Sequence, residues 1–528
     1  MTRSDPADLT RPDLTRPDLT RRDALSLLAA LSAFGLAPAH AQSPEAAGMT
    51  LGTPVPFNPS MVQIIARDLA AKPYVAPPMV PKAWQDLTFD QFRGIWFDTR
   101  HTLWRGTKGA VQAEFFPAGL YFTSPVKINA VESGTARPVA FEMRVFDTTD
   151  QFPALPEDGA GFAGFRLLGE LQAEGRFQEY AVFQGATYFR AIARGQNYGL
   201  SARGLALKTA SPKGEEFPAF TEFWIEAADQ GAPEVRVHAL MDSPSVAGAF
   251  SFTIARGDPT VMTVAAHLYP RVDLDEVGIA PGTSMFTFNQ ANRAAFDDFR
   301  DAVHDSDGLL MLTGASELIW RPLTNPKTLE ISAFADTSPQ GFGLMQRARK
   351  VGAFEDLVAH YENRPSLWTE PVGDWGPGHV VLVEIPTDTE VNDNIVAFWR
   401  PQAPLKAGAE HVLNYRLHWC DAAPVEGAVA RVIDCRTGAR IWEEGRIFAV
   451  DFEPHPALGY DPAQLEGVIA TNAGAVTNWI VQKNPATGGM RLDFTVHAPD
   501  AGAVELRAEL HRNGRRISEV WLNRWVAR

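Results

Sequence analysis

The sequence predicts a mainly β protein, with a large N-terminal antiparallel β-sandwich followed by a small immunoglobulin-like β-sandwich. Runs of β-branched and aromatic residues occur at 139–146, 234–240 and 261–268, and turn clusters such as 242–245 and 257–259 follow or separate them. Helical patterns are few. Many strands with few helices favour packed antiparallel sheets over an α/β arrangement.

Composition supports a folded chain that does not bind nucleic acid. The 528 residues are 45% hydrophobic and 21% charged, which gives enough apolar surface for large cores. The formal net charge is −15, so no basic surplus exists to neutralise a phosphate polyanion. A neutral substrate fits better, and the 13 tryptophans offer flat faces for sugar rings, although most are expected in the core.

Residues 1–41 are predicted to be a twin-arginine export signal. Arg21 and Arg22 precede a modest apolar stretch that ends in Ala39-His40-Ala41, a small-x-small cleavage pattern. The apolar stretch is short for a membrane span and contains Gly35 and Pro38. We therefore expect a periplasmic mature chain that begins near Gln42 and has no membrane span.

Three helices are predicted along the chain. Asn58-Pro59 opens the first, and Thr88 with Gln91 forms a capping box for the second. Apolar residues at helical spacing from Phe354 to Tyr361 predict the third, which Asn363-Arg364-Pro365 would end.

The chain is predicted to divide near residue 405. A Pro- and Gly-containing stretch at 401–408 separates a domain at 50–402 from an immunoglobulin-like domain at 409–528. In the second domain, 504–510 and 517–526 are predicted strands joined by an Asn513-Gly514 type I′ turn. Cys420 and Cys435 either form one disulfide or remain free thiols.

Two acidic clusters are the strongest candidates for chemistry, at residues 304–308 and 388–394. Glycoside hydrolysis needs one protonated carboxyl that donates to the leaving oxygen and a second carboxylate that activates water. Asp393 has nearby carboxylates, which would raise its pKa. The 388–394 loop also has alternating oxygen ligands, as in a calcium loop, but Asp393 and Trp399 stand where Gly and Glu would be needed. A solvated turn is the alternative for either cluster.

The chain closely resembles the periplasmic glucans biosynthesis proteins G and D, over about residues 50–525. The twin-arginine signal favours the D member. The resemblance is carried by segments in the same order as in the family, at residues 183–190, 198–205, 214–218, 242–245, 280–286, 304–309, 320–323, 341–347, 364–368 and 392–399.

The resemblance implies a cleft in the N-terminal sandwich that acts on a β-1,2-linked glucan backbone with inversion at the anomeric carbon. By motif, Asp393 matches the general acid and Asp305 the general base, which acts through a relay of waters and hydroxyls that includes Tyr361. Glu390 lies where a sugar-contacting carboxylate is expected. The further candidates for the substrate site are Asp307, which is also the rival for the base, and Tyr188, Arg203, Arg347 and Trp368.

Three functions remain open at this point. The first is an inverting endo-β-1,2-glucanase, and the second is a transglycosylase of the same chemistry with a sugar hydroxyl as acceptor. The third is a non-catalytic glucan-binding scaffold for backbone synthesis or branching. The inner-membrane glucan synthase machinery is a candidate partner, and neither a metal nor an organic cofactor is required by this chemistry.

Overall fold

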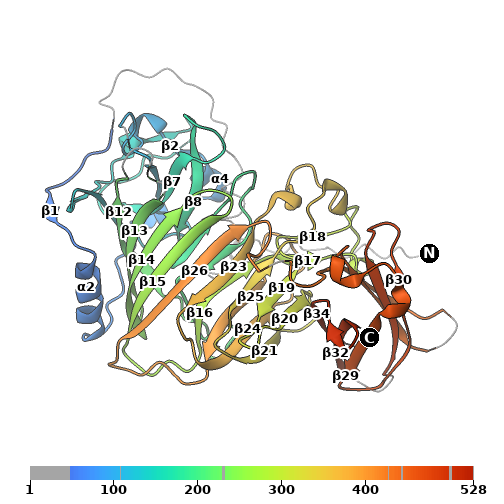
Figure 1. Cartoon of the computed structure of the whole chain (residues 1–528). Coiled ribbons are helices and arrows are strands. Elements are labelled where there is room, and N and C mark those ends of the chain that lie inside the picture. Colours follow the sequence, from blue (N-terminus) through green and yellow to red (C-terminus); the bar gives the residue numbers. More distant parts are fainter. Residues whose placement is uncertain are drawn as a thin grey trace, which may run out of the picture.

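The computed structural model describes residues 48–526, except 108, 151, 229–231, 233, 426, 442–443 and 499–501. The predicted export signal at 1–41 lies outside the described residues. The described chain is mainly β, and two large sheets face each other in a sandwich, as predicted (Figure 1).

The first sheet has sixteen strands and runs the length of the molecule. Most neighbours are antiparallel, but β4 and β12 pair in parallel, as do β20 and β34. Short β33 (Arg515–Arg516) pairs with β32 at the side of this order. Across the sheet the strands are β1 (Val55–Pro56), β5 (Thr135–Pro138), β4 (Lys127–Glu132), β12 (Ala219–Glu226), β13 (Glu234–Asp242), β14 (Val246–Ala255), β15 (Thr260–Pro270), β26 (His411–Cys420), β23 (Ser366–Val372), β22 (Gly341–Met345), β19 (Gly308–Leu312), β20 (Leu318–Pro322), β34 (Val520–Val526), β32 (Ala503–Arg512) and β29 (Glu466–Thr471).

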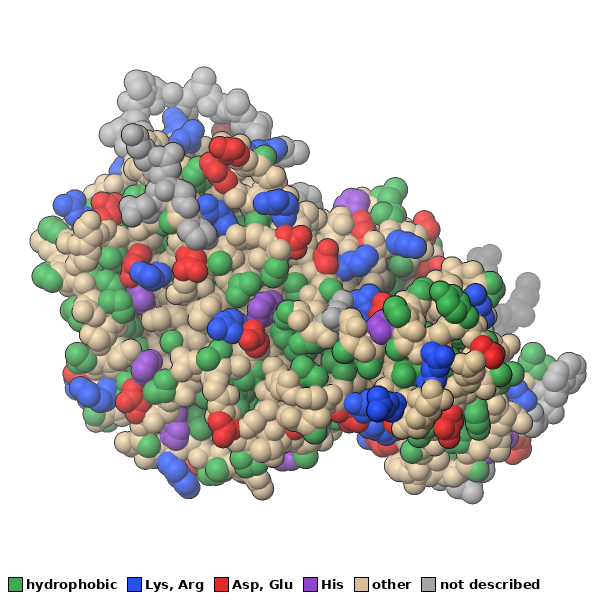
Figure 2. Space-filling view, in the orientation of Figure 1, with side chains coloured by type: hydrophobic (Ala, Val, Ile, Leu, Met, Phe, Trp, Pro, Cys, Tyr) green, Lys and Arg blue, Asp and Glu red, His purple; other side chains and the backbone are tan. Residues whose placement is uncertain are grey.

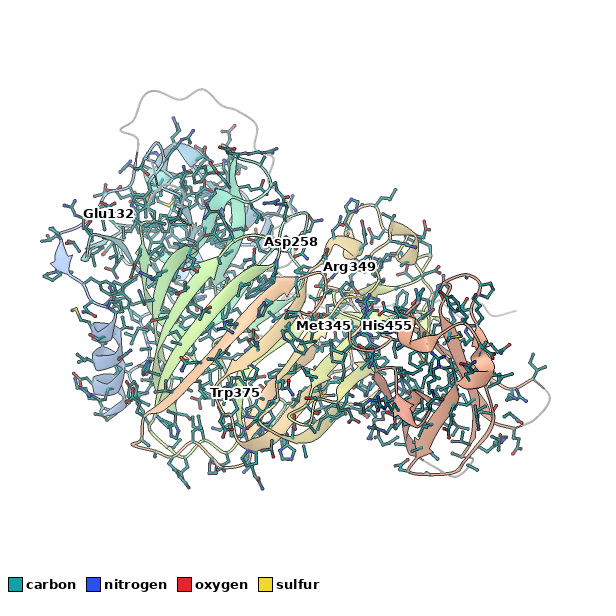
Figure 3. The ribbon with its side chains drawn as sticks, in the orientation of Figure 1. Glu132, Asp258, Met345, Arg349, Trp375 and His455 are labelled. Atoms are coloured by element: carbon teal, nitrogen blue, oxygen red, sulfur yellow. The ribbon has the colours of Figure 1, made fainter. Side chains whose placement is uncertain are left out.

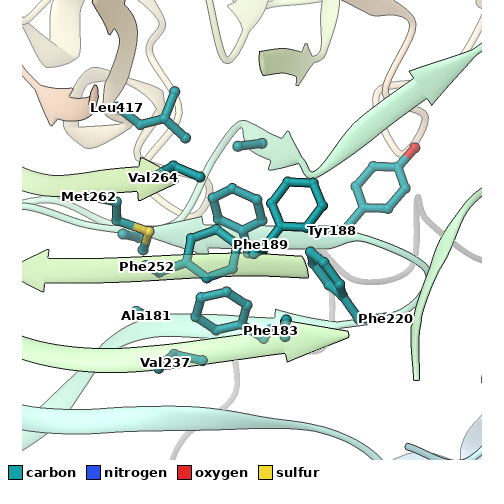
Figure 4. Close-up of a cluster of buried hydrophobic side chains, with 14 of the residues drawn as sticks. Ala181, Phe183, Tyr188, Phe189, Phe220, Val237, Phe252, Met262, Val264 and Leu417 are labelled. Carbon is teal, nitrogen blue, oxygen red and sulfur yellow. The ribbon is translucent and has the colours of Figure 1, made fainter. Parts of the chain in front are cut away.

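The second sheet has ten strands and covers one face of the first. Between them lies an aromatic core, in which Phe183 stacks on Phe189 at 5.4 Å and meets Phe252 edge-on at 5.2 Å (Figure 4). Across the sheet the strands are β21 (Glu330–Thr337), β24 (Pro377–Glu384), β25 (Ile395–Pro401), β16 (Val277–Ser284), β10 (Ser201–Arg203), β9 (Tyr188–Ala191), β8 (Phe177–Gln184), β7 (Phe162–Glu170) and β3 (Gln112–Pro117), with β11 (Leu205–Leu207) beside β16.

The C-terminal unit is a smaller sandwich. A four-stranded sheet of β27 (Val432–Ala439), β28 (Arg446–Phe452), β31 (Met490–His497) and β30 (Ala475–Lys483) packs against β29, β32 and β34. Asn513 and Gly514 both have positive φ, of 51° and 71°, and join β32 to β33 as a tight hairpin, as predicted. Cys420 and Cys435 are not joined in a disulfide in this structure.

The two units share one sheet and part of one core. Strand β26 lies between β15 and β23, in the middle of the first unit, so the change of unit follows Cys420 and not the predicted 401–408 stretch (Figure 1). Strand β34 returns to pair with β20, with Ile319 opposite Val520. Trp320, Met345 and Trp368 of the first unit pack into the core of the second.

Two of the predicted helix starts are confirmed. Asn58 Oδ1 accepts a hydrogen bond from the Ser60 amide at 3.0 Å, at the start of α2 (Ser60–Ala70). Thr88 and Gln91 form the predicted capping box of α4 (Phe89–Arg93). A further short helix, α3 (Lys82–Gln85), precedes α4.

The predicted helix from Phe354 to Tyr361 is wrong. Asp356 Oδ1 accepts hydrogen bonds from the amides of Val358 and Ala359, which holds a turn in place of helical bonding. Glu355 and His360 have positive φ, a conformation that a right-handed helix excludes. Val358 is 91% exposed, and only the short 3₁₀ turns η4 (Val351–Ala353) and η5 (Tyr361–Asn363) form there.

The predicted strand at 139–146 is also wrong over most of its length. The 3₁₀ turn η2 (Met143–Val145) occupies its end, and only β6 (Phe146–Thr148) continues as a strand. Strand β6 pairs with β2 (Ile95–Phe97) in a separate two-stranded sheet.

Charges of both signs are interspersed on the face shown in Figure 2. Within the described part of the chain, no helix combines the length and the apolar character needed to span a membrane.

Candidate active site

Asp393 lies at the end of the loop between β24 and β25, two residues before β25 begins. The adjacent Asn394 fixes this loop end, because its Oδ1 accepts from the Phe286 amide at 2.8 Å and its Nδ2 donates to the Phe286 and Ile385 carbonyls. Asp393 is therefore held on a rigid strand end and not on the free part of the loop.

The surroundings of Asp393 favour a protonated carboxyl. Burial raises the pKa of Asp393 most, and the negative charge of Asp305 raises it further, whereas Arg190 and Arg364 lower it, with a result of about 6. Arg190 approaches only to 4.0 Å. Among the described residues, Asp393 Oδ2 has no hydrogen-bond partner, so this buried oxygen is available to a substrate group.

Asp305 follows β18 (Val303–His304), which pairs with β17 (Phe286–Phe288). Its amide donates to the Met285 carbonyl at 2.8 Å, and its Oδ1 lies 2.9 Å from an Arg364 guanidinium nitrogen. Burial raises the pKa of Asp305 above its ordinary value, and Arg364, Arg190 and His304 oppose that rise. The ion pair with Arg364 favours the ionised carboxylate that a general base needs.

The fold brings the two acidic clusters together, although they are far apart in the sequence. Arg190 and Arg364 act electrostatically on both Asp305 and Asp393, and Asp305 itself acts on Asp393. Buried Tyr361 belongs to the same group, because Arg364 lies 4.9 Å above its ring. Burial, and then the charges of Asp305 and Glu390, raise the pKa of Tyr361, which keeps its hydroxyl protonated.

Asp307, the rival for the base, is occupied by other contacts. Its Oδ2 accepts hydrogen bonds from the amides of Arg347 at 2.9 Å and Ala348 at 3.0 Å, and its Oδ1 lies 3.0 Å from His304 Nε2. A carboxylate that holds two amides is poorly placed to exchange a proton with a relay. These contacts favour Asp305 over Asp307 as the base.

Glu390 lies at the edge of the site on the same loop as Asp393. Its Oε2 accepts a hydrogen bond from Arg300 at 2.6 Å, and Arg300 also bonds to Asp298 and Asp356. Arg300 thus ties together three loops, one of which leads to Asp393 and one to Tyr361. Glu390 remains partly exposed, which leaves its carboxylate accessible to a sugar.

Tyr188 and Arg203 lie opposite each other on the paired strands β9 and β10. On β9, Tyr188 is two residues from Arg190, which approaches Asp393 to 4.0 Å, and Tyr188 itself packs with Phe189 in the large core cluster. The Arg203 guanidinium lies 5.1 Å from the Tyr188 ring and forms an ion pair with Glu215 at 2.9 Å. Both side chains are buried, and their contact with sugar remains a prediction.

The side chains of Arg347 and Trp368 pack toward the C-terminal unit. Arg347 forms an ion pair at 2.6 Å with Glu519 of the C-terminal unit. Trp368 is fully buried in the core of that unit, against Gly341. These contacts with the C-terminal unit favour a structural role for both side chains over a contact with sugar.

Two arginines of the site were not singled out from the sequence. Arg190 ends the 183–190 segment and Arg364 begins the 364–368 segment, where it was taken only as part of a helix stop. Both arginines lie in segments that carry the family resemblance, and this position was the sequence signal that could have identified them as site residues. Among the described residues, no cluster of His, Cys, Asp and Glu is arranged to hold a metal ion.

Comparison with known proteins gives the family. The family model described as "Periplasmic glucan biosynthesis protein, MdoG" matches residues 57–525. The chain belongs to the periplasmic glucan biosynthesis protein family. The proteins named "Glucans biosynthesis protein G" from Rhodopseudomonas palustris (strain BisA53) and Bradyrhizobium diazoefficiens (strain USDA 110) are 46% and 45% identical to it, over 95% and 92% of this chain and 99% and 96% of theirs.

A third family member, "Glucans biosynthesis protein G" from Vibrio cholerae, is 45% identical over 89% of this chain and 87% of its own. These members are named for protein G, so they do not support the preference for protein D that the twin-arginine pattern predicted. The membership places the described sandwich, with its paired carboxyls, in a family of periplasmic glucan biosynthesis.

Proposed function

We propose that this family member is a periplasmic, anomer-inverting endo-β-1,2-glucanase, exported by the twin-arginine route, with Asp393 as general acid and Asp305 as general base. The observation that carries the proposal is the pair of buried carboxyls in different charge environments. Asp393 has a pKa of about 6 and a buried oxygen without a partner among the described residues, whereas Asp305 is held by Arg364. Two carboxyls with separated roles are what inverting hydrolysis requires.

In the proposed reaction, Asp393 donates its proton to the glycosidic oxygen as the bond from that oxygen to the anomeric carbon breaks. A water molecule attacks that carbon from the opposite face, and its proton reaches Asp305. The resemblance to the family implies that the proton passes through waters and hydroxyls, and Tyr361 is the protein hydroxyl proposed for this relay. Arg190 and Arg364 limit the repulsion between the two carboxyls.

The test is product analysis with the purified mature protein and linear β-1,2-glucan. Mass spectrometry and early-time proton NMR should detect shorter glucans that appear first as the α-anomer. Products with a new linkage and no net uptake of water would show that the reaction is transglycosylation and not hydrolysis. Glucan binding without any product would indicate the non-catalytic scaffold function.

The pH dependence of kcat/KM should report Asp393. The acid must carry its proton, so activity should fall as the pH rises through about 6, by about tenfold for each further pH unit. Initial rates on β-1,2-glucan between pH 4 and about 8, in one buffer of constant ionic strength, would test this. A rate that stays constant or increases over the upper half of this range would contradict the assignment.

A further inference from the structure

One buried ion pair joins the C-terminal unit to the strand ends that carry the site. The Arg347 guanidinium donates to Glu519 Oε2 at 2.8 Å and to Oε1 at 2.6 Å, and it lies 3.6 Å from the Trp320 ring centroid. Glu519 is fully buried, and its Oε2 also accepts from the Val432 amide at 2.9 Å. A buried pair with its hydrogen bonds satisfied holds a single geometry, and loss of one partner leaves an unpaired charge.

Arg347 is connected to the segment that bears Asp305. The amides of Arg347 and Ala348 both donate to Asp307 Oδ2, and Asp307 Oδ1 faces His304 Nε2 at 3.0 Å. Asp305 lies in the chain between His304 and Asp307, so the two amide hydrogen bonds to Asp307 hold the segment on its C-terminal side.

The preceding residue extends the connection to the relay tyrosine. The buried Gln346 Nε2 donates to the carbonyls of His304 at 3.0 Å and Tyr361 at 3.2 Å. Residues 346–348 therefore hold both the segment around Asp305 and the backbone of Tyr361. Figure 3 labels Met345 and Arg349, the residues on either side of this segment.

We propose that Arg347 and Glu519 are positioning residues, which make the C-terminal unit part of the active site by holding residues 346–348, and through them Asp305 and Tyr361, in the reactive arrangement. This inference rests on the proposed function. It gives Arg347 a role different from sugar contact, and it gives the C-terminal unit a part in the reaction. A displacement of about 1 Å at a catalytic group can lower the rate up to about a hundredfold.

The test compares two variants of the full chain, each at an ion pair that crosses the seam, the contact between the first unit and the C-terminal unit. Glu519→Gln removes the charge that holds Arg347. Glu317→Gln is the matched control, because Glu317 contacts Arg507 at 2.7 Å and Arg516 at 2.6 Å across the seam and has no contact with residues 346–348 among those described. We expect Glu519→Gln to lower kcat by about tenfold or more with KM within about twofold, and Glu317→Gln to leave kcat unchanged.

Thermal unfolding of both variants separates positioning from stability. A fall in kcat for Glu519→Gln at a temperature where both variants are folded supports the inference. Equal kcat in the two variants would overturn it, while turnover in the wild type would keep the proposed function intact. No turnover in the wild type would overturn both.

A second pair covers the case in which Glu519→Gln does not fold. Arg347→Lys keeps the charge opposite Glu519 but loses the bidentate contact and the stacking on Trp320. Its control is Arg507→Lys, at the matched position opposite Glu317. A lower kcat in Arg347→Lys alone supports the inference, and equal kcat in both overturns it.

Discussion

Replacement of Asp393 by Asn should remove nearly all turnover on β-1,2-glucan while the fold and glucan binding persist. Asn has almost the same shape but no proton to give to the leaving oxygen, so the loss should be about a thousandfold or more. The substitution also removes a buried ionisable group beside Arg190 at 4.0 Å, a weak contact whose loss should affect stability little. Initial rates, glucan affinity by calorimetry and thermal unfolding would measure the three effects.

The control for this variant is Asp388→Asn in the same loop. Asp388 is exposed, whereas Asp393 is buried, so its replacement should leave the rate within about twofold. Wild-type rates in Asp393→Asn would refute the acid assignment. Equal losses in both variants would indicate that the loop as a whole, and not one carboxyl, determines activity.

Replacement of Trp368 by Ala should lower the free energy of unfolding more than any other substitution proposed for this protein, with no change in KM for glucan. The indole lies against Gly341, where an added Cβ would be 2.2 Å from the ring, and it packs in the core that both units share. Truncation of a fully buried tryptophan costs about 3–5 kcal/mol of unfolding free energy. Urea denaturation would measure this, together with KM at a temperature where the variant is folded.

Trp479→Ala is the matched comparison, because Trp479 is 48% exposed on β30. Its replacement should change the unfolding free energy by about 0.5 kcal/mol or less. If Trp368→Ala does not fold, Trp368→Phe should lose less stability and keep the wild-type KM. A raised KM in a well-folded Trp368 variant would restore this residue as a candidate for sugar contact.

The features that sequence analysis predicted correctly depend on short-range chemistry. The capping box at Thr88 and the turn at Asn513-Gly514 each need only a few neighbouring residues, and both formed as expected. Asp393 and Asp305 were proposed as acid and base from local motifs and a family resemblance, and these roles stay predictions. Their proximity could not be predicted from either cluster alone, because it depends on the pairing of β16 with β25 and of β17 with β18.

The features that sequence analysis missed depend on long-range packing. The apolar residues from Phe354 to Tyr361 do have helical spacing, but the Asp356 side chain accepts hydrogen bonds from two backbone amides and forms a turn there instead of a helix. Trp368 and Arg347 sit in family-like segments, and only the tertiary structure assigns them to the contact between units. Strand β26 follows a linker-like stretch, yet it pairs at the centre of the first sheet.

The parallel pairing of β20 with β34 has a consequence for how the chain is made. During synthesis the whole large sandwich emerges before β34, so β20 is an open sheet edge, with Trp320 uncovered, until the last strand arrives. Parallel pairing between strands so distant in the chain is slow to form. The nascent chain therefore carries an unpaired sheet edge at β20 until the last strand is made, and a chaperone that covers this edge would protect it from pairing with other chains.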